Sequence, residues 1–446
     1  MEAPSGAPPK QIKPLNETPD AQPMTSRIKG FYTLPLEERK KIAASRLGVS
    51  VGELERAFES GGLSIDRAEH AIENVIGLYS LPFALGLNFR INDRDRLIPM
   101  VVEEPSVVAA ASNAARIVRE GGGFYAECDE GLMIAQVELR GASDFARAEA
   151  AINSEREALF ALADASIPNI VRRGGGIRDL EIRDLGEGII VVHLLVDTLD
   201  AMGANIVNTM AEAVSHDLAR IAGATIGLRI LSNLADRKRV RVRARIPVSA
   251  LAIKGYSGEE VRDAIALASR LAERDPYRAV THNKGIMNGV DAVILATGND
   301  FRAVEAGAHG YAARSGRYSP LATFRVDEDG ALLGELEMPM AVGVVGGMIR
   351  IHEAARLALQ LSEVESASDL AMIAGAAGLA SNLAALRALA TVGIQEGHMG
   401  LHARQVAIAA GARGEEVEAV ALAIHQRASI TLDDARAALD ELRARR

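Results

Sequence analysis

The spacing of apolar residues along the chain predicts helices interleaved with a smaller number of strands. Apolar positions recur every three to four residues in four stretches, which is the pattern of a helix with one buried face. These stretches are 34–47, 63–76, 106–120 and 261–274. Residues 97–102 and 239–246 have strand patterns instead. Residues 370–390 are rich in alanine and apolar on nearly all sides, which predicts a buried central helix.

Residues 127–233 form a second predicted unit with its own order of elements, β-α-β-β-α-β. The pattern locates strands at 133–137, 189–196 and 228–232, helices at 145–163 and 200–221, and a triple-glycine turn at 174–176. This order indicates an antiparallel sheet covered by helices on one face.

The chain is therefore expected to hold one large unit that the small unit interrupts. Residues 1–25 contain six prolines among polar residues, so we expect them to be disordered. The large unit comprises 26–126 and 234–392. Residues 393–446 add two or three short helices, the last beginning near residue 432 with Thr431 as its N-cap. The glycines within 343–347 predict a close backbone approach to a ligand or a helix.

Composition and charge narrow the class of protein. A net charge of −9 over 446 residues argues against a nucleic-acid partner, which calls for a basic face. One cysteine, Cys128, excludes an intramolecular disulfide framework and fits a reducing compartment. Neither a secretory signal nor an uninterrupted apolar run of about 20 residues occurs, so we expect a cytoplasmic protein without a membrane anchor. No His/Cys cluster has metal-ligand spacing, so no metal site is expected.

Four short segments carry candidate reactive groups. Glu104 follows a strand, and a desolvated carboxylic acid there could donate a proton. Lys284 lies in a Gly- and Asn-rich segment that predicts a turn, from which an ammonium could stabilise a developing alkoxide. Asp300 could orient that lysine, and His398 could protonate a departing thiolate. Together these groups suit reduction of a thioester.

Each of these residues also has an ordinary structural explanation. Glu104 can be an exposed carboxylate at a strand end, and Lys284 a solvated surface lysine. Asp300 can be the N-cap of a helix that starts at Phe301. His398 can be a hydrogen-bonded histidine at a helix start.

A possible dinucleotide site follows the buried strand at 189–196. There the chain opens a helix, and its small residues permit the close approach of a pyrophosphate to the helix N-terminus. The segment consists of Asp200, Ala201, Met202, Gly203, Ala204 and Asn205. The triple glycine at 174–176 lacks the G-x-G-x-x-G spacing of a dinucleotide fingerprint. The absence of a G-x-S-x-G elbow argues against a serine hydrolase.

Six motifs, in this order, resemble those of class II 3-hydroxy-3-methylglutaryl-CoA (HMG-CoA) reductases, and the resemblance extends from about Ser26 to the C-terminus. The motifs are Glu73-Asn74-Val75-Ile76-Gly77, Glu103-Glu104-Pro105-Ser106, Asp200-Ala201-Met202-Gly203, His282-Asn283-Lys284-Gly285, Gly298-Asn299-Asp300 and Gly397-His398-Met399.

The resemblance implies a fold and a role for each motif. The implied fold is α+β: a large, mainly helical domain around a long central helix, a small ferredoxin-like cofactor domain and a helical C-terminal flap. Glu104, Lys284, Asp300 and His398 resemble the family's catalytic residues, His398 being carried by the flap. Residues that resemble the substrate contacts are Ser106, Arg278, Asn233 and Asn288, and residues 200–205 match the nicotinamide-dinucleotide loop. Arginine suits the free carboxylate of the substrate.

The implied reaction interconverts HMG-CoA with mevalonate and coenzyme A by two hydride transfers, through a mevaldyl-CoA hemithioacetal and mevaldehyde. Some bacterial members run it in the oxidative direction. Members of the family are homodimers with active sites at the subunit interface, sometimes assembled into hexamers. Runner-up hypotheses are a reductase of another acyl-CoA and a non-catalytic protein on the same fold. Retention of all four catalytic-type residues argues against the latter.

The choice between NAD(H) and NADP(H) depends on the segment before the triple glycine. NAD-selective relatives carry an aspartate there, at a position that falls near Ile167 in this chain. Asp164 lies three residues earlier and takes that role if the alignment has a gap. Otherwise Arg172 or Arg173 would accept a 2′-phosphate and favour NADP(H). We expect NAD(H).

Overall fold

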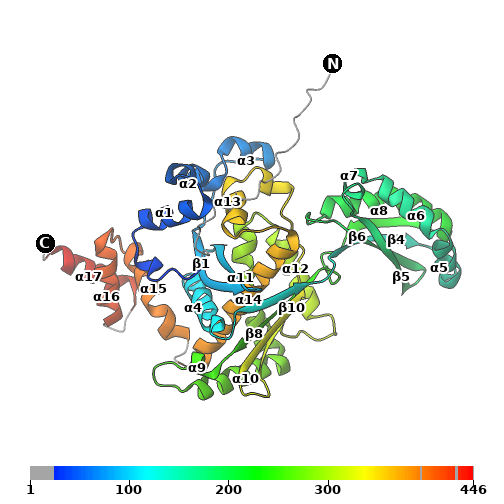
Figure 1. Ribbon diagram of the computed structural model, residues 1–446. Coiled ribbons are helices and arrows are strands. Elements are labelled where there is room, and N and C mark those ends of the chain that lie inside the picture. Colours follow the sequence, from blue (N-terminus) through cyan, green and yellow to red (C-terminus); the bar gives the residue numbers. More distant parts are fainter. Residues whose placement is uncertain (1–24, 392–393, 427–429, 445–446) are drawn as a thin grey trace, which may run out of the picture.

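The computed structural model describes residues 25–391, 394–426 and 430–444, and of residues 394–401 the backbone alone. Figure 1 shows a central body, a small unit that projects to its right, and a group of C-terminal helices to its left. The predicted disordered leader, residues 1–25, lies almost wholly outside the described residues.

The central body contains a six-stranded sheet in the order β2-β1-β3-β8-β10-β9. Its strands are β1 (Phe83–Ile91), β2 (Arg94–Val101), β3 (Phe124–Cys128), β8 (Arg239–Ile246), β9 (Ala322–Val326) and β10 (Leu332–Pro339). The helices of the body are η1 (Phe31–Thr33), α1 (Leu36–Leu47), α2 (Val51–Phe58), η2 (Glu59–Gly62), α3 (Ile65–Ala71), α4 (Val107–Arg119), α9 (Val248–Leu251), α10 (Gly258–Arg274), α11 (Pro276–Ala296), α12 (Phe301–Ala312), η3 (Gly347–Arg350), α13 (Glu353–Leu361) and α14 (Ala367–Ala390). The predicted strand at 239–246 is confirmed as β8.

The predicted central helix is confirmed as α14, which packs against α11, α4 and the sheet. Among the described residues, α14 is long and apolar enough to cross a membrane, but 78% of that apolar window is buried inside the protein. Glycines allow the close contact between α11 and α14. A Cβ atom on Gly289 would lie 2.3 Å from the Ala377 carbonyl oxygen, and one on Gly378 would lie 2.7 Å from Val290 Cγ2.

The small unit is a four-stranded antiparallel sheet in the order β5-β6-β4-β7, with helices packed over it. Its elements are β4 (Leu132–Arg140), α5 (Phe145–Ser154), α6 (Arg156–Ala165), α7 (Pro168–Val171), β5 (Gly176–Gly186), β6 (Ile189–Asp197), α8 (Ala204–Ala222) and β7 (Thr225–Leu231). This is the predicted β-α-β-β-α-β order with the strand arrangement of a ferredoxin-like unit. The unit encloses its own apolar core, which includes Met133, Val192 and Met210.

Three C-terminal helices surround a third, smaller core that includes Ala403, Val420 and Leu439. They are α15 (Ile394–Ala409), α16 (Glu415–Gln426) and α17 (Leu432–Ala444). The hydroxyl of Thr431 accepts a hydrogen bond from the Asp434 backbone at 3.2 Å, as a helix N-cap does.

Three local predictions were wrong, and each error has a physical cause. The turn predicted around Lys284 is part of α11, because Gly289 packs closely against α14 rather than bending the chain. The helix predicted over 145–163 is broken at Glu155, where the Ser154 hydroxyl bonds back to the backbone. The helix predicted over 63–76 ends at residue 71, before a stretch of Asn, β-branched residues and Gly that disfavours helix.

Candidate functional site

Three predicted site residues meet where β2 ends beside α11. Glu104 lies three residues beyond β2, and Lys284 and Asn288 lie four residues apart on α11, so they share one helix face. Lys284 Nζ is 2.7 Å from Glu104 Oε2, and Asn288 Nδ2 is 3.5 Å from the same oxygen. Side-chain exposures of 60% for Lys284 and 37% for Glu104 leave the pair open to a ligand.

Ser106, two residues beyond Glu104, has a strained backbone and an unpartnered hydroxyl. Its φ of 74° places a residue other than glycine in the left-handed region, and α4 starts directly after it. Its Oγ atom is buried, and no hydrogen-bond partner from the described residues reaches it. Backbone strain of this kind clusters at functional sites, and an orphaned hydroxyl can bind a ligand atom.

The structure places Arg278 and Asn233 further from the pair. Arg278 is half-buried in the first turn of α11, and burial lowers the pKa of its guanidinium. Asn233 is exposed in the connection between β7 and β8. The connection packs against α12: a Cβ atom added to Gly307 of that helix would lie 2.8 Å from the Asn233 carbonyl oxygen. Among the described residues, no hydrogen bond joins either side chain to Glu104 or Lys284.

Asp300 is the N-cap of α12, as the structural alternative predicted. Its carboxylate accepts hydrogen bonds from the Arg302 and Ala303 backbone and pairs with the Arg302 side chain at 3.2 Å. The preceding residue, Asn299, bonds to the Ile294 carbonyl at the C-terminal end of α11. Ten residues of helix, about 15 Å, separate Ile294 from Lys284. Within one chain Asp300 therefore lies far along α11 from the lysine that it was expected to orient.

The predicted dinucleotide segment, residues 200–205, forms a loop and the start of α8. Gly203 has a φ of 101°, and a Cβ atom there would lie 2.4 Å from Thr198 Cγ2, so the turn requires glycine. α8 begins at Ala204, and no side chain caps its N-terminus. Its first backbone N–H groups can therefore bind an anionic group.

Gly343 connects this loop to the Asp300 segment. A Cβ atom on Gly343 would lie 2.5 Å from the Met202 nitrogen, and Val344 donates a hydrogen bond to the Asp200 carbonyl at 2.9 Å. The Gly343 N–H donates to Asn299 Oδ1 at 2.8 Å. A close backbone approach at 343–347 was predicted to a ligand or a helix, but here Gly343 and Val344 approach the loop of the small unit.

The triple-glycine turn lies beside the same loop. A Cβ atom on Gly175 would be 2.8 Å from the Asp197 carbonyl oxygen, and one on Gly176 would be 2.6 Å from Asp164 Oδ1. The same Asp164 oxygen accepts a hydrogen bond from the Ile177 backbone at 2.9 Å. Asp164 thus faces the turn next to the loop that precedes α8.

Sequence reasoning missed Lys238, which lies at the junction between the small unit and the body. Its side chain is almost completely buried, and Nζ is 3.4 Å from the Ala201 carbonyl oxygen. Burial lowers the pKa of Lys238 to about 8, and the charges of Asp197 and Asp200 oppose that shift. No motif marks this lysine, because its contact with the loop depends on how the two units meet.

His398 lies on α15, but its side chain is outside the described residues. The described part of the chain contains no group of three or more His, Cys, Asp or Glu residues suited to a metal ion.

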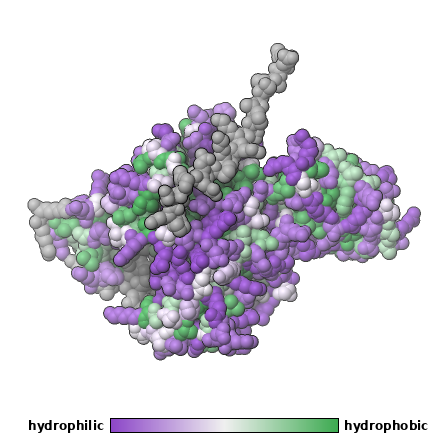
Figure 2. All heavy atoms as spheres, viewed as in Figure 1, coloured by the Kyte–Doolittle hydropathy of each residue, from purple (hydrophilic) through white to green (hydrophobic). Residues whose placement is uncertain are grey.

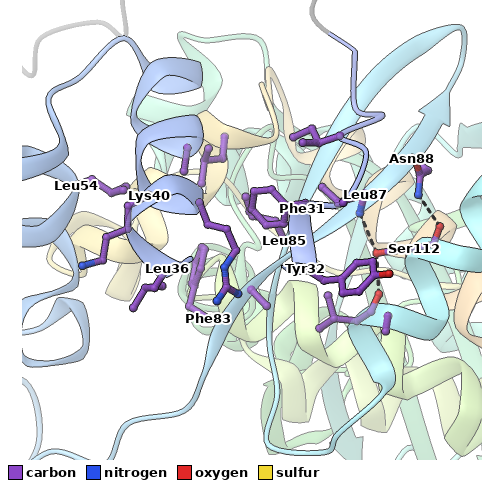
Figure 3. Close-up of a pocket in the computed structure, with 18 of the residues that line it drawn as sticks. Phe31, Tyr32, Leu36, Lys40, Leu54, Phe83, Leu85, Leu87, Asn88 and Ser112 are labelled. Carbon is purple, nitrogen blue, oxygen red and sulfur yellow. Dashed lines mark hydrogen bonds between the residues drawn. The ribbon is translucent and has the colours of Figure 1, made fainter. Parts of the chain in front are cut away.

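A large cavity of about 1530 Å³ lies away from the Glu104–Lys284 pair, between the N-terminal helices and the body. Figure 3 shows Phe31, Tyr32, Leu36 and Phe83 around it. Neither Glu104 nor Lys284 lines this cavity, so its size does not mark it as the reaction centre.

Comparison with protein families finds one match that covers most of the chain. The family model described as hydroxymethylglutaryl-coenzyme A reductase matches residues 35–403. The 3-hydroxy-3-methylglutaryl-coenzyme A reductase of Archaeoglobus fulgidus is 48% identical over 424 residues, which span 94% of this chain and 96% of that protein. A probable reductase of Borreliella burgdorferi is 38% identical, over 75% of this chain and 77% of its own length.

Solved structures agree with these sequence matches. A 3-hydroxy-3-methylglutaryl-coenzyme A reductase from Streptococcus pneumoniae superposes with a TM-score of 0.79 at 39% identity, covering 93% of this chain and 99% of its own. A second structure of a class II enzyme from that species, bound to NADPH in open conformations, has a TM-score of 0.78 at 41% identity. It covers 81% of this chain and 99% of its own.

Proposed function

The chain belongs to the class II hydroxymethylglutaryl-coenzyme A reductase family, and we propose that it interconverts HMG-CoA with mevalonate and coenzyme A by two hydride transfers. Mevaldyl-CoA hemithioacetal and mevaldehyde are the proposed intermediates. The 2.7 Å contact between Lys284 and Glu104 is the observation that carries this proposal, and the unpartnered hydroxyl of Ser106, two residues beyond Glu104, supports it.

The paired groups suit the charge that develops during reduction of a thioester. The Lys284 ammonium stabilises negative charge on the carbonyl oxygen as hydride arrives, and Glu104 supplies the proton to the aldehyde-level oxygen. Ser106, Asn288, Asn233 and Arg278 are proposed to hold the hydroxymethylglutaryl group, the guanidinium binding its carboxylate. His398 is proposed to protonate the coenzyme A thiolate, and Asp300 to complete the hydrogen-bond network of the pair.

The nicotinamide dinucleotide supplies the hydride when it is bound. Residues 200–205 are proposed to hold it, with its pyrophosphate at the uncapped N-terminus of α8. Asp164, beside the triple glycine, is proposed to accept hydrogen bonds from the adenosine ribose and so to favour NAD(H) over NADP(H). Arg172 and Arg173 are the alternative contacts that would favour NADP(H).

Initial rates with NAD and NADP test this assignment together with the function. We expect mevalonate oxidation with free coenzyme A, with kcat/KM for NAD at least about tenfold above that for NADP, because a carboxylate repels the 2′-phosphate. Asp164→Asn should reduce this preference about tenfold. The change keeps an oxygen for the Ile177 N–H, and Asp217→Asn on the exposed face of α8 is the control.

Three outcomes decide between the alternatives. A preference for NADP in the unaltered protein would reject Asp164 and move the assignment to Arg172 and Arg173. An unchanged NAD preference in Asp164→Asn would reject Asp164 alone. Absence of turnover in either direction with both dinucleotides would reject the reductase.

We also propose a cytoplasmic homodimer that can assemble into hexamers, without a nucleic-acid or membrane partner. Figure 2 shows hydrophobic residues reaching the surface around the N-terminal helices. Ile76 and Tyr79, between α3 and β1, and Tyr32 and Leu36, beside the cavity, are exposed apolar residues that a second copy could bury. The distance of about 15 Å along α11 between Lys284 and the Asp300 segment supports a site completed across the subunit interface.

A further inference from the structure

A ring of side chains joins α11 to α12 beside the proposed reaction centre. From α11, Asn283 Nδ2 donates to the Tyr318 hydroxyl at 3.0 Å. The Tyr318 hydroxyl is 2.7 Å from His309 Nδ1, and His309 Nε2 is 2.6 Å from Glu305 Oε2. Glu305 also shares a hydrogen bond with Asp291, which closes the ring on α11.

The contact between Asp291 and Glu305 brings two carboxyl groups together. Asp291 Oδ1 is buried, and no donor from the described residues reaches it. Two ionised carboxylates repel each other, whereas a hydrogen bond forms between them when one holds a proton. Burial, the hydrogen bond with Glu305 and the charge of Glu305 raise the pKa of Asp291 to about 8. The direction of this shift favours a proton on the pair at neutral pH.

Charged and titratable neighbours of the pair lie on both helices. Among the described residues, Glu305 is the charged group that acts on Asp291. α4, α10, α13, α14 and β2 also pack against α11, and none of their described titratable groups contributes to the shift in the pKa of Asp291. On the α12 side, His309 contacts Glu305, and Tyr318 lies beyond it. Burial raises the pKa of the Tyr318 hydroxyl, so it stays neutral there.

The ring meets α11 at Asn283 and Asp291, and the helix segment between these two residues carries the proposed catalytic lysine. Lys284, Asn288 and Asp291 are spaced i, i+4 and i+7, so they lie along one face of the helix. Asp291 is two turns, about 10 Å, from Lys284. Asn283, at the other end of the ring, directly precedes Lys284. Both ends of the segment are thus tied to α12 or to the loop that follows it.

We propose that the Asp291–Glu305 pair, with one shared proton, is a positioning device that holds the Lys284 and Asn288 segment of α11 in register with α12. Loss of the proton leaves two facing carboxylates, which push α11 and α12 apart and move Lys284 relative to Glu104. The effect on turnover rests on the proposed reductase function. The presence of the shared proton does not depend on that function. An experiment can therefore reject the shared proton and the reductase function separately.

Substitutions at Asp291 test the proposal. Asp291→Asn offers an amide N–H to Glu305 at every pH, so it replaces the shared proton, whereas Asp291→Ala removes the link. At pH 7 we expect Asp291→Ala to lose about tenfold or more in kcat with little change in KM, because small displacements of catalytic groups are costly. Asp291→Asn should retain most of the activity. Asp263→Asn, an exposed change on α10, is the matched control.

The pH dependence separates positioning from a merely structural role. Between pH 7 and pH 9, kcat of the unaltered protein should fall about tenfold further than that of Asp291→Asn, because most pairs have lost their proton at pH 9. The folded protein binds this proton more tightly than the unfolded chain, whose aspartate has a pKa near 3.8. Stability should therefore decline as pH rises from about 4 to about 8, and less steeply in Asp291→Asn.

Infrared spectroscopy of the unaltered protein follows the proton without any turnover. A carboxylic-acid carbonyl band should persist at pH 7, disappear as pH rises through about 8, and be missing from Asp291→Asn. The proposal is overturned if that band is absent at pH 7. It is also overturned if the alkaline fall in kcat is the same in Asp291→Asn and the unaltered protein. Both tests use only the unaltered protein and Asp291→Asn, so they stand even if Asp291→Ala does not fold.

Discussion

Replacing Glu104 with glutamine should lower kcat by about 10²–10⁴-fold with little change in KM, because the amide keeps the shape of the side chain but cannot donate the proton. Glutamine can still accept a hydrogen bond from Lys284 Nζ, which lies 2.7 Å from the carboxylate. The loss should therefore appear in the chemical step, and single-turnover measurements of dinucleotide oxidation would show it directly.

Glu103→Gln is the matched control for this change. Glu103 is the adjacent carboxylate, and its side chain is exposed. The same chemical change at that position should leave kcat within about twofold of the unaltered protein. If both variants retained full activity, Glu104 would not be the proton donor. If both lost activity equally, a general effect of charge in this segment would explain the result.

Two inactive variants should restore activity to each other when they share a dimer. Lys284→Met removes the ammonium, and Asp300→Asn removes a charge but keeps a residue suited to the N-cap of α12. If an active site takes Lys284 from one copy and Asp300 from the other, one of the two sites in the mixed dimer is intact. The mixed dimer should then have about half the activity of the unaltered protein.

Two different affinity tags would isolate the mixed dimer for this measurement. Each variant alone should have about 1% of normal activity or less. A mixed dimer as inactive as its parents would show that both residues serve one chain, and that the 15 Å of helix between them is bridged within it. A protein that stays monomeric while active would reject the shared site altogether.

Much of the fold was predictable because local patterns and tertiary packing agree. β8 occupies the predicted residues, α14 is buried as its composition indicated, and the small unit has the predicted order of strands. Strands β1, β3, β5, β9 and β10 were not located from the sequence, because they are short or carry glycine and charged residues within the strand. Their pairing with neighbouring strands stabilises them.

Part of the candidate site was likewise predictable from the sequence, and part was not. Motifs that resemble the family led to Glu104, Lys284 and Asn288, and the structure brings these three together. The glycines near Lys284 predicted a turn, but one of them, Gly289, allows α11 to pack closely against α14. Asp291 and Glu305 could not be paired from sequence, because their contact depends on how α12 folds back along α11.

The stoichiometry of the forward reaction tests the central claim most directly. The unaltered protein would be given HMG-CoA and excess NADH, and oxidised dinucleotide would be compared with free coenzyme A thiol at completion. Two hydride transfers predict two NADH oxidised for each thiol released, with mevalonate as the product. One NADH for each thiol, with an aldehyde left over, would contradict the account and indicate a reductase that stops after the first transfer. No thiol release with NADH or NADPH would contradict the reductase assignment itself.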